Sequence, residues 1–262
     1  AEAQSLLANG SAVRVYSKNK AHTGLNYCTN LYVGDYVQNK FIEDLAEDAE
    51  GIKRIAVLRA DVDNLGTAFV SGFEREGSSA ADRSKYTTLS RSAAFSKNMS
   101  MFFKCYINSI LSRKDKKIDY FSLCNEDESD GKKLLIVYSG GDDIFILGAW
   151  DEVIGFAKEL REDFVRFAAG SPLTISMGLV LTKPNKPINY VAHMAEEALE
   201  EAKAIEGKDA ITIFNETVKW KNYLNDNNLT AELLKLGEEK LTTALLYRLL
   251  ELVNMSKNIK SD

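Results

Sequence analysis

Two pairs of aspartates in this sequence have a residue type and a spacing that could support metal chemistry. Asp61 and Asp63 end the apolar run IKRIAVLRADVD, and Asp142 and Asp143 end the segment YSGGDD. Acids at strand ends are commonly solvated turn residues, so either pair alone would be weak evidence. Carboxylates that lie close together repel one another unless cations neutralise them, and all-oxygen ligation favours Mg²⁺ or Mn²⁺. If the fold brings the pairs together, they predict a two-metal site.

The elements that must position these aspartates are strands. Residues 52–62 form an apolar run rich in β-branched side chains, and residues 132–139 and 143–149 flank the Gly-Gly-Asp-Asp turn. Two apolar runs around paired glycines are typical of a β-hairpin, and Gly140 and Gly141 are expected to supply positive φ there. Residues 172–182 and 210–214 predict two further strands.

Helical periodicity separates these strands. From residue 84 to about 112, one predicted face holds Leu89, Ala93, Met99, Phe103, Ile107 and Ile110. Residues 151–169 predict an amphipathic helix with Asp151 as its N-cap. Residues 188–206 predict another helix, whose inward side holds Val191, Ala195, Ala198 and Ala202. Two more helical stretches follow, the last from about 230 to 255.

The fold class predicted from this order is α+β, with a ferredoxin-like βαββαβ palm domain. The first and third strands of such a sheet are antiparallel neighbours at its centre. The end of the first strand, with Asp61 and Asp63, is therefore expected beside the turn that holds Asp142 and Asp143. The chain is predicted to have three parts: a linker or cap segment at 1–50, a GGDD palm at 51–220 and a C-terminal helical segment at 221–262.

A site of this kind suits nucleotidyl transfer, because two ions can lower the pKa of an attacking hydroxyl and stabilise a leaving pyrophosphate. Main-chain amides after Asp63 could hold a triphosphate, as turn nests and helix starts do. The predicted substrate-binding residues are Asn64, Gly66, Ser139, Gly140, Gly141, Lys203 and Lys208. Surface charge is the alternative interpretation for the two lysines, and the end of a strand for Ser139.

Composition argues against several other classes of protein. The formal net charge is -5, which disfavours a free-standing nucleic-acid binder with a basic face. The three cysteines lie far apart and predict neither a disulfide framework nor a zinc site, so a reducing cytoplasm is the expected location. His22 and His193 have no neighbouring His, Cys or following Asp, so a histidine-based nuclease is not expected. No apolar run approaches the ~20 residues that span a membrane, and no membrane partner is expected.

Several segments resemble, in order and spacing, the second palm domain of the large subunit of type III-A CRISPR–Cas effector complexes. They are LRADVDNLG, SGGDDIFILG, TISMGLVL and EEAKAIEGKDAITIF. The helix YTTLSRSAAFSKNMSMFFKCYIN and the upstream segment NLYVGDY are similar to that family as well. The resemblance covers roughly residues 30–220, and the final helices resemble the start of the family's small C-terminal domain.

The resemblance implies an activity, the conversion of ATP into cyclic oligoadenylates with 3′–5′ bonds once an effector complex has captured target RNA. Asp61, Asp142 and Asp143 would be catalytic and would bind two Mg²⁺ or Mn²⁺ ions. Asp63 would be a further metal ligand or would hold the turn. The implied partners are ATP, the other subunits of the type III-A complex, guide RNA and target RNA through that complex, and a first palm domain missing from this chain.

Without that palm and without an HD nuclease domain, the chain alone is expected to bind ATP and metal, with little or no synthesis and no DNA cleavage by that route. Asp209 departs from the family pattern and would add negative charge beside Lys208. One alternative function is a GGDEF-type diguanylate cyclase, which uses GTP, although the turn here continues as Asp-Ile instead of Glu-Phe. Another is a non-catalytic scaffold whose leucine-rich C-terminal helices contact partner subunits.

Overall fold

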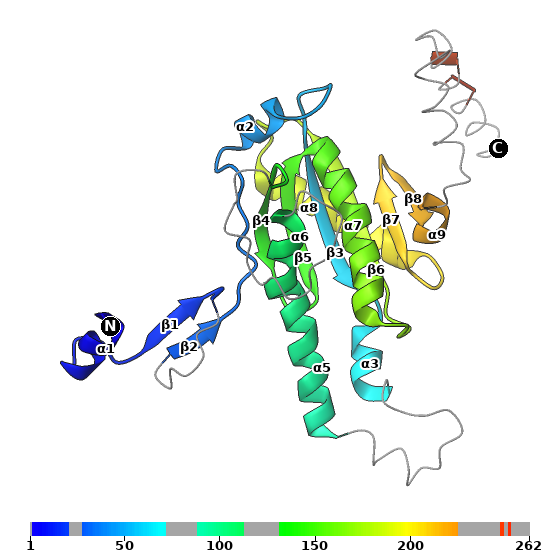
Figure 1. The fold of residues 1–262 in the computed structure, drawn as a ribbon. Helices are drawn as coiled ribbons and strands as arrows, with labels where there is room; N and C mark the ends of the chain where they lie inside the picture. The colour runs from blue at the N-terminus through cyan, green and yellow to red at the C-terminus, as the bar shows by residue number, and fades with distance from the viewer. Residues whose placement is uncertain are drawn as a thin grey trace, which may run out of the picture. The chain divides into compact units, whose positions relative to one another are not determined.

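The structure, a computed structural model, describes residues 2–20, 28–71, 88–112, 131–224, 247–248 and 251–252. The chain divides into two compact units, Ala1–Trp220 and Lys221–Asp262. The first unit contains a six-stranded sheet with the strand order β4-β5-β3-β6-β7-β8 (Figure 1). Near the N-terminus, a short helix α1 (Glu2–Ala8) precedes two parallel strands, β1 (Val15–Lys18) and β2 (Cys28–Leu31).

Four adjacent strands of this sheet, from β4 to β6, have the predicted ferredoxin-like order. β3 (Ile55–Val62) pairs antiparallel with β5 (Asp143–Ala149) on one side and with β6 (Ile175–Thr182) on the other. β4 (Leu134–Ser139) pairs antiparallel with β5. The α+β ferredoxin-like fold class is therefore confirmed.

Two further strands extend this sheet beyond β6. β7 (Ala210–Ile213), which the sequence predicted as a strand, runs parallel to β6, and β8 (Glu216–Lys219) pairs antiparallel with β7. β8 was not predicted from the sequence. The turn between β7 and β8 is made by Phe214 and Asn215, which both have positive φ. Positive φ is common for Asn but rare for Phe, so the sequence gives only a weak signal for this turn.

The described helices after β2 lie before, between and after the strands of the six-stranded sheet. In chain order they are α2 (Ile42–Glu47), α3 (Leu65–Ser71), α5 (Leu89–Met101), the π-helix η1 (Phe102–Tyr106), α6 (Ile107–Ser112), α7 (Trp150–Ala168), α8 (Ile188–Ala204) and α9 (Trp220–Tyr223).

Different helices cover the two faces of the sheet. Val57 of β3 lies opposite Leu147 of β5, and both pack with α2 and α8 in one apolar cluster. Alternate residues of a strand face opposite sides of a sheet. Leu58 and Ile146 therefore face the other layer, where α7 contacts β3, β5 and β6. Figure 1 shows α7 and α8 on opposite sides of the central strands.

The helix predicted from residue 84 differs from the observed one in two ways. Its first residues, 84–87, lie outside the described part of the chain, and α5 begins at Leu89 after Thr88, whose side chain accepts a hydrogen bond from the Arg91 amide. Leu89 is 87% exposed, so the predicted apolar face is buried only from Met99 onward. Residues 102–106 form a π-helix, and its Phe102 ring contacts α7 aromatics.

The predicted N-cap of the next helix is wrong. α7 begins at Trp150, and Ala149 precedes it without a side-chain cap. Because β5 runs directly into α7, no loop residue is available to serve as a cap. Asp151 lies in the first turn instead, where a negative charge suits the helix dipole. The inward side predicted for α8 is confirmed, since all four of its residues are buried.

Residues before Gly51 belong to the same compact unit as the sheet. Leu45 of α2 is fully buried in the apolar cluster beneath α8, and Val37 forms a bridge with Leu135 of β4. The helix predicted from about 230 to 255 lies almost entirely outside the described residues, and His22 lies outside them too. In the described part of the chain, no helix combines the length and the apolar character needed to cross a membrane.

Candidate active site

The two predicted aspartate pairs meet at one end of the central strands. Asp61 of β3 lies directly opposite Asp143, the first residue of β5. The Val62 amide donates a hydrogen bond to the Asp142 carbonyl at 3.1 Å. Opposite residues in an antiparallel pair project to the same face. Since Asp61 and Asp143 are an even number of residues from Val57 and Leu147, both lie on the face that α8 covers.

Lys203, in the last turn of α8, forms a salt bridge with Asp61. Lys203 Nζ lies 2.6 Å from Asp61 Oδ2, and the side chains are 24% and 23% exposed. Burial raises the pKa of Asp61, Lys203 lowers it, and Asp142 and Asp143 raise it again, with a net rise. Burial lowers the pKa of Lys203, but the hydrogen bond and charge of Asp61 outweigh that effect and the pKa is raised.

The raised pKa values of Asp61 and Lys203 show that negative charge is in excess at this end of the sheet. A salt bridge alone would lower the pKa of a carboxyl group, yet the pKa of Asp61 is raised. The one ammonium therefore does not compensate for burial and for the two neighbouring acids. This end of the sheet is a place where additional positive charge would be stabilising.

Tyr138 of β4 is a site residue that was not predicted from the sequence. It makes a hydrogen bond to Asp143, and the charge of Asp143, followed by burial, raises the pKa of Tyr138. The side chain is half exposed. Its signal in the sequence is weak: an aromatic residue that lies opposite Phe145 across a register shift in β4, and so faces the same side as Asp143.

A Cβ atom at Gly140 would lie 2.1 Å from Tyr138 Oη and 2.8 Å from Asp143 Oδ1, so it would have to displace the ends of these two side chains. Gly141 is open, with no atom within 4 Å of the same position. Neither glycine has positive φ, so that expectation is wrong. The Gly140 amide closes the turn by donating to the Asp143 carbonyl at 2.9 Å.

Asp63 lies deeper than the other three aspartates and is 1% exposed. Its Oδ2 accepts hydrogen bonds from Thr174 Oγ1 at 2.7 Å, Ser176 Oγ at 2.9 Å and the Asp209 amide at 3.1 Å. These bonds tie the end of β3 to the start of β6 and to the loop before β7, which favours the turn-holding alternative. Oδ1 has no hydrogen-bond partner among the described residues, and Asp63 as a metal ligand stays a prediction.

The remaining predicted substrate contacts lie around this end of the sheet. Asn64 has a φ of 57° and, like Gly66, is exposed at the start of α3. The Ser139 hydroxyl is already engaged, since it donates a hydrogen bond to the Phe103 carbonyl. Lys208 has a φ of 50° in the loop before β7, and its carbonyl accepts from Lys219 Nζ at 2.9 Å. Their roles toward a substrate stay predictions.

The charge of Asp209 does not stand alone beside Lys208. Arg161 of α7 binds its carboxylate through two hydrogen bonds, Nε to Oδ1 at 2.8 Å and a terminal nitrogen to Oδ2 at 2.9 Å. A bidentate pair of this kind is among the stronger polar contacts in proteins. Because Arg161 pairs with the Asp209 carboxylate, the negative charge of Asp209 argues less strongly against Lys208 as a phosphate contact.

Asp61, Asp142 and Asp143 offer only hard oxygen donors, the type that Mg²⁺ and Mn²⁺ prefer. In the described ranges, no three His, Cys, Asp or Glu side chains gather closely enough to form a metal centre as they stand. Lys203 holds Asp61 and Tyr138 holds Asp143 instead. The donor set and its location fit a divalent cation, provided that these side chains rotate toward one another.

Known proteins resemble both the sequence and the fold. Residues 54–212 match the family model of the Cas10/Cmr2 second palm domain. A curated relative from Mycobacterium tuberculosis is named as the single-strand-specific deoxyribonuclease Cas10/Csm1 of a subtype III-A CRISPR system. It is 37% identical over 260 residues, which cover 97% of this chain and 31% of the relative. The chain thus spans about a third of that relative's length.

Two solved structures share the fold. A Csm1–Csm4 cassette in complex with cA3 is 26% identical with a TM-score of 0.73, covering 94% of this chain and 36% of that one. A Csm1–Csm4 cassette in complex with one ATP is 26% identical with a TM-score of 0.69, covering 92% and 35%. Because the family match extends over more than half of the sequence and includes every strand of the βαββαβ core, the chain belongs to the Cas10/Cmr2 family and carries its second palm domain.

Proposed function

We propose that this chain is the ATP-using palm of a type III-A CRISPR effector subunit, a metal-dependent nucleotidyltransferase that contributes to the synthesis of cyclic oligoadenylates. The observation that carries the proposal is the direct pairing of Asp61 with Asp143 on adjacent central strands, with Asp142 at the turn between β4 and β5. The structural relatives in complex with ATP and with cA3 support adenine nucleotides as ligands.

In this proposal Asp61, Asp142 and Asp143 would hold Mg²⁺ or Mn²⁺, which would lower the pKa of an attacking 3′-hydroxyl and stabilise the leaving pyrophosphate. The new bond joins that 3′ oxygen to the α-phosphorus of a second ATP. The bond from the α-phosphorus to pyrophosphate breaks, and the hydroxyl proton is released.

The chain's own residues contribute position and charge. Lys203 holds Asp61 before the nucleotide binds, and its ammonium then screens the phosphate charge. The Tyr138 hydroxyl fixes one rotamer of the Asp143 carboxylate, and Gly140 leaves room for that contact. Asn64, Gly66 and Lys208 are the proposed phosphate contacts, and Gly141 leaves open space for the nucleotide.

The chain spans between a fifth and a third of the length of its curated relatives, so we expect complete synthesis to require more than these residues. A first palm domain would supply the second nucleotide site. Other subunits of a type III-A complex would act as partners, which the Csm1–Csm4 structures support, and guide and target RNA would act through them. The proposed location is the cytoplasm.

Thermal melting with ATP or GTP, with and without Mn²⁺, tests the nucleotide and the metal together. Ligand at 100 times its dissociation constant adds about 2.7 kcal/mol to the free energy of unfolding. The test variant is Asp142→Ala with Asp143→Ala. The matched control is Glu197→Ala with Glu201→Ala, which removes two exposed acids of α8.

A Mn²⁺-dependent shift with ATP that the test variant loses and the control keeps supports the proposal. A larger shift with GTP would instead indicate a diguanylate cyclase. No metal-dependent shift with either nucleotide would favour the second candidate, a non-catalytic scaffold. That candidate has one specific observation behind it, the salt bridge by which Lys203 already engages Asp61.

A further inference from the structure

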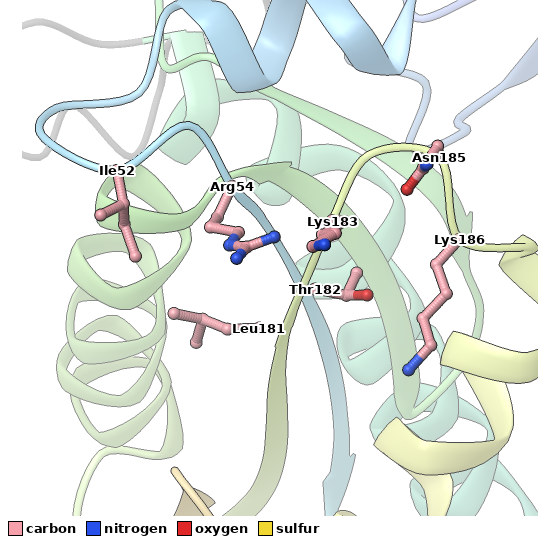
Figure 2. Close-up of a pocket in the computed structure, with 7 residues that line it drawn as sticks. All are labelled: Ile52, Arg54, Leu181, Thr182, Lys183, Asn185 and Lys186. Carbon is pink, nitrogen blue, oxygen red and sulfur yellow. The ribbon is translucent and has the colours of Figure 1, made fainter.

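A basic hollow lies at the opposite end of β3 from the aspartates. It has a volume of about 510 Å³ and is lined by residues just before β3 and by the segment that leads from β6 to α8 (Figure 2). Arg54 immediately precedes β3, and Asp61 lies seven residues further along the strand. At a rise of about 3.3 Å per residue, the two sites are about 23 Å apart. The hollow, here named the Arg54 pocket, is therefore separate from the candidate active site.

The charged side chains that line the Arg54 pocket are all basic: Arg54, Lys183 and Lys186. Lys186 is partly engaged, because its Nζ lies 4.7 Å from the centre of the Tyr190 ring on α8. Arg54 and Lys183 form no salt bridge with any acid in the described part of the chain. A concave surface lined by charges of one sign concentrates the electrostatic field, and a positive field of this kind attracts anions.

The rest of the lining has a different character. Ile52 and Leu181 form an apolar side, and Asn185 adds an amide at the rim. Figure 2 shows the Arg54 guanidinium directed across the hollow toward Lys183, with Ile52 and Leu181 on the other side of Arg54. Apolar walls with a few convergent polar groups, in a volume of about 300–1,000 Å³, are typical of small-molecule sites.

We propose that the Arg54 pocket binds one nucleotide unit without a metal ion. Arg54 and Lys183 contact its phosphate, Asn185 donates a hydrogen bond to it, and Ile52 and Leu181 pack against the base or ribose. Arg suits this role because its planar fork matches phosphate oxygens. The nucleotide unit has two possible sources, a free nucleotide or a residue of a single-stranded RNA.

Isothermal titration of the full chain in EDTA tests this proposal with two probes, AMP and a hexa-adenylate RNA. The pocket variants are Arg54→Ala and Lys183→Glu. Since Lys183 is exposed, its replacement does not depend on repacking the core, and the test stands even if Arg54→Ala fails to fold. The matched control is Lys97→Ala with Lys158→Ala, which removes two exposed lysines from α5 and α7.

Each pocket variant is expected to weaken binding at least about tenfold, because bonds to a charged phosphate are stronger than neutral ones. The control is expected to bind as the wild type does. Asp142→Ala with Asp143→Ala should also bind normally in EDTA, which separates this site from the proposed catalytic one. Similar affinities for AMP and the RNA identify a free nucleotide as the ligand, and much tighter, salt-sensitive binding of the RNA identifies a strand.

Two results would overturn the proposal. One is the absence of binding by both probes at millimolar concentration. The other is binding that the pocket variants leave unchanged, or that the control variant weakens as much as they do, since either pattern would place the nucleotide elsewhere on the chain.

Discussion

Removing the Lys203 ammonium is expected to destabilise the sheet unit at neutral pH. Lys203→Met keeps the aliphatic stem and deletes the charge that lies 2.6 Å from Asp61. Exposed pairs contribute about 0–1 kcal/mol, and breaking a buried pair costs about 3–5 kcal/mol. Both side chains are about a quarter exposed, so this pair falls between those limits. We expect a loss of about 1–3 kcal/mol, because Asp61 is left with Asp142 and Asp143 and no cation.

The pH dependence follows from the raised pKa of Asp61. The folded carboxyl group binds a proton more readily than the unfolded one, whose pKa is about 3.9. The contribution of Asp61 to the free energy of unfolding therefore falls as pH rises from its unfolded pKa through its folded pKa. Without Lys203 the folded pKa rises further, so the difference between Lys203→Met and the wild type should be present at pH 7 and should vanish toward pH 4.

Urea denaturation followed by tryptophan fluorescence measures this difference. The chain has two tryptophans, Trp150 and Trp220, and Trp220 is fully buried with its indole nitrogen donating to the Ile175 carbonyl at 3.0 Å. The signal therefore reports on the sheet unit. The control is Lys158→Met on α7. A double-mutant cycle with Asp61→Asn isolates the pair.

Two outcomes would refute this reasoning. The first is a Lys203→Met variant within about 0.5 kcal/mol of the wild type at pH 7, with additive effects in the cycle, since surface changes away from special features usually stay in that range. The second is a penalty that persists unchanged at pH 4. Either would mean that the ammonium does not neutralise Asp61 in solution.

Three further changes test other contacts. Gly178→Ala would place a Cβ atom 2.3 Å from the Leu199 amide nitrogen of α8. Overpacking of this kind should lower the free energy of unfolding in urea by about 1–3 kcal/mol or more. An unchanged urea midpoint would show that α8 shifts freely. Alkaline difference spectra against Tyr138→Phe should show that the pKa of Tyr138 lies above its ordinary value, and Asp143→Asn should lower it toward that value. An unchanged pKa of Tyr138 in Asp143→Asn would exclude the charge of Asp143 as the cause. Asp63→Ala should lower the free energy of unfolding by about 2–4 kcal/mol, since two hydroxyls and one amide lose their shared acceptor. A loss below about 0.5 kcal/mol would show that the turn does not depend on the Asp63 carboxylate.

The strand order and the meeting of the aspartates could be predicted because they follow from local signals. A run that ends in acids and a Gly-Gly turn between apolar runs each identify a strand end without reference to distant residues. Once the βαββαβ order is recognised, the adjacency of the first and third strands places Asp61 beside Asp143, and the structure pairs them directly.

The contacts from distant helices could not be predicted in the same way. Lys203 reaches Asp61, and Arg161 reaches Asp209, only because of how α8 and α7 are placed over the sheet. Periodicity gives the inward face of a helix but not its position along its own axis. The positive φ expected at Gly140 is wrong for a related reason. A Cβ atom at this position would meet the Tyr138 hydroxyl of the neighbouring strand, a contact that the turn sequence alone does not reveal.

α8 links the two ends of the palm sheet. The segment that leads into its first turn supplies Lys183 and Lys186 to the Arg54 pocket, and its last turn supplies Lys203 to Asp61. Between them Gly178 of β6 lets the helix backbone approach the sheet, since a Cβ atom there would meet main-chain atoms of α8. A glycine inside a strand often marks such a close approach. The placement of α8 over the sheet therefore brings Lys203 to Asp61, and the segment that enters this helix supplies two of the three cations of the Arg54 pocket, about 23 Å away along β3.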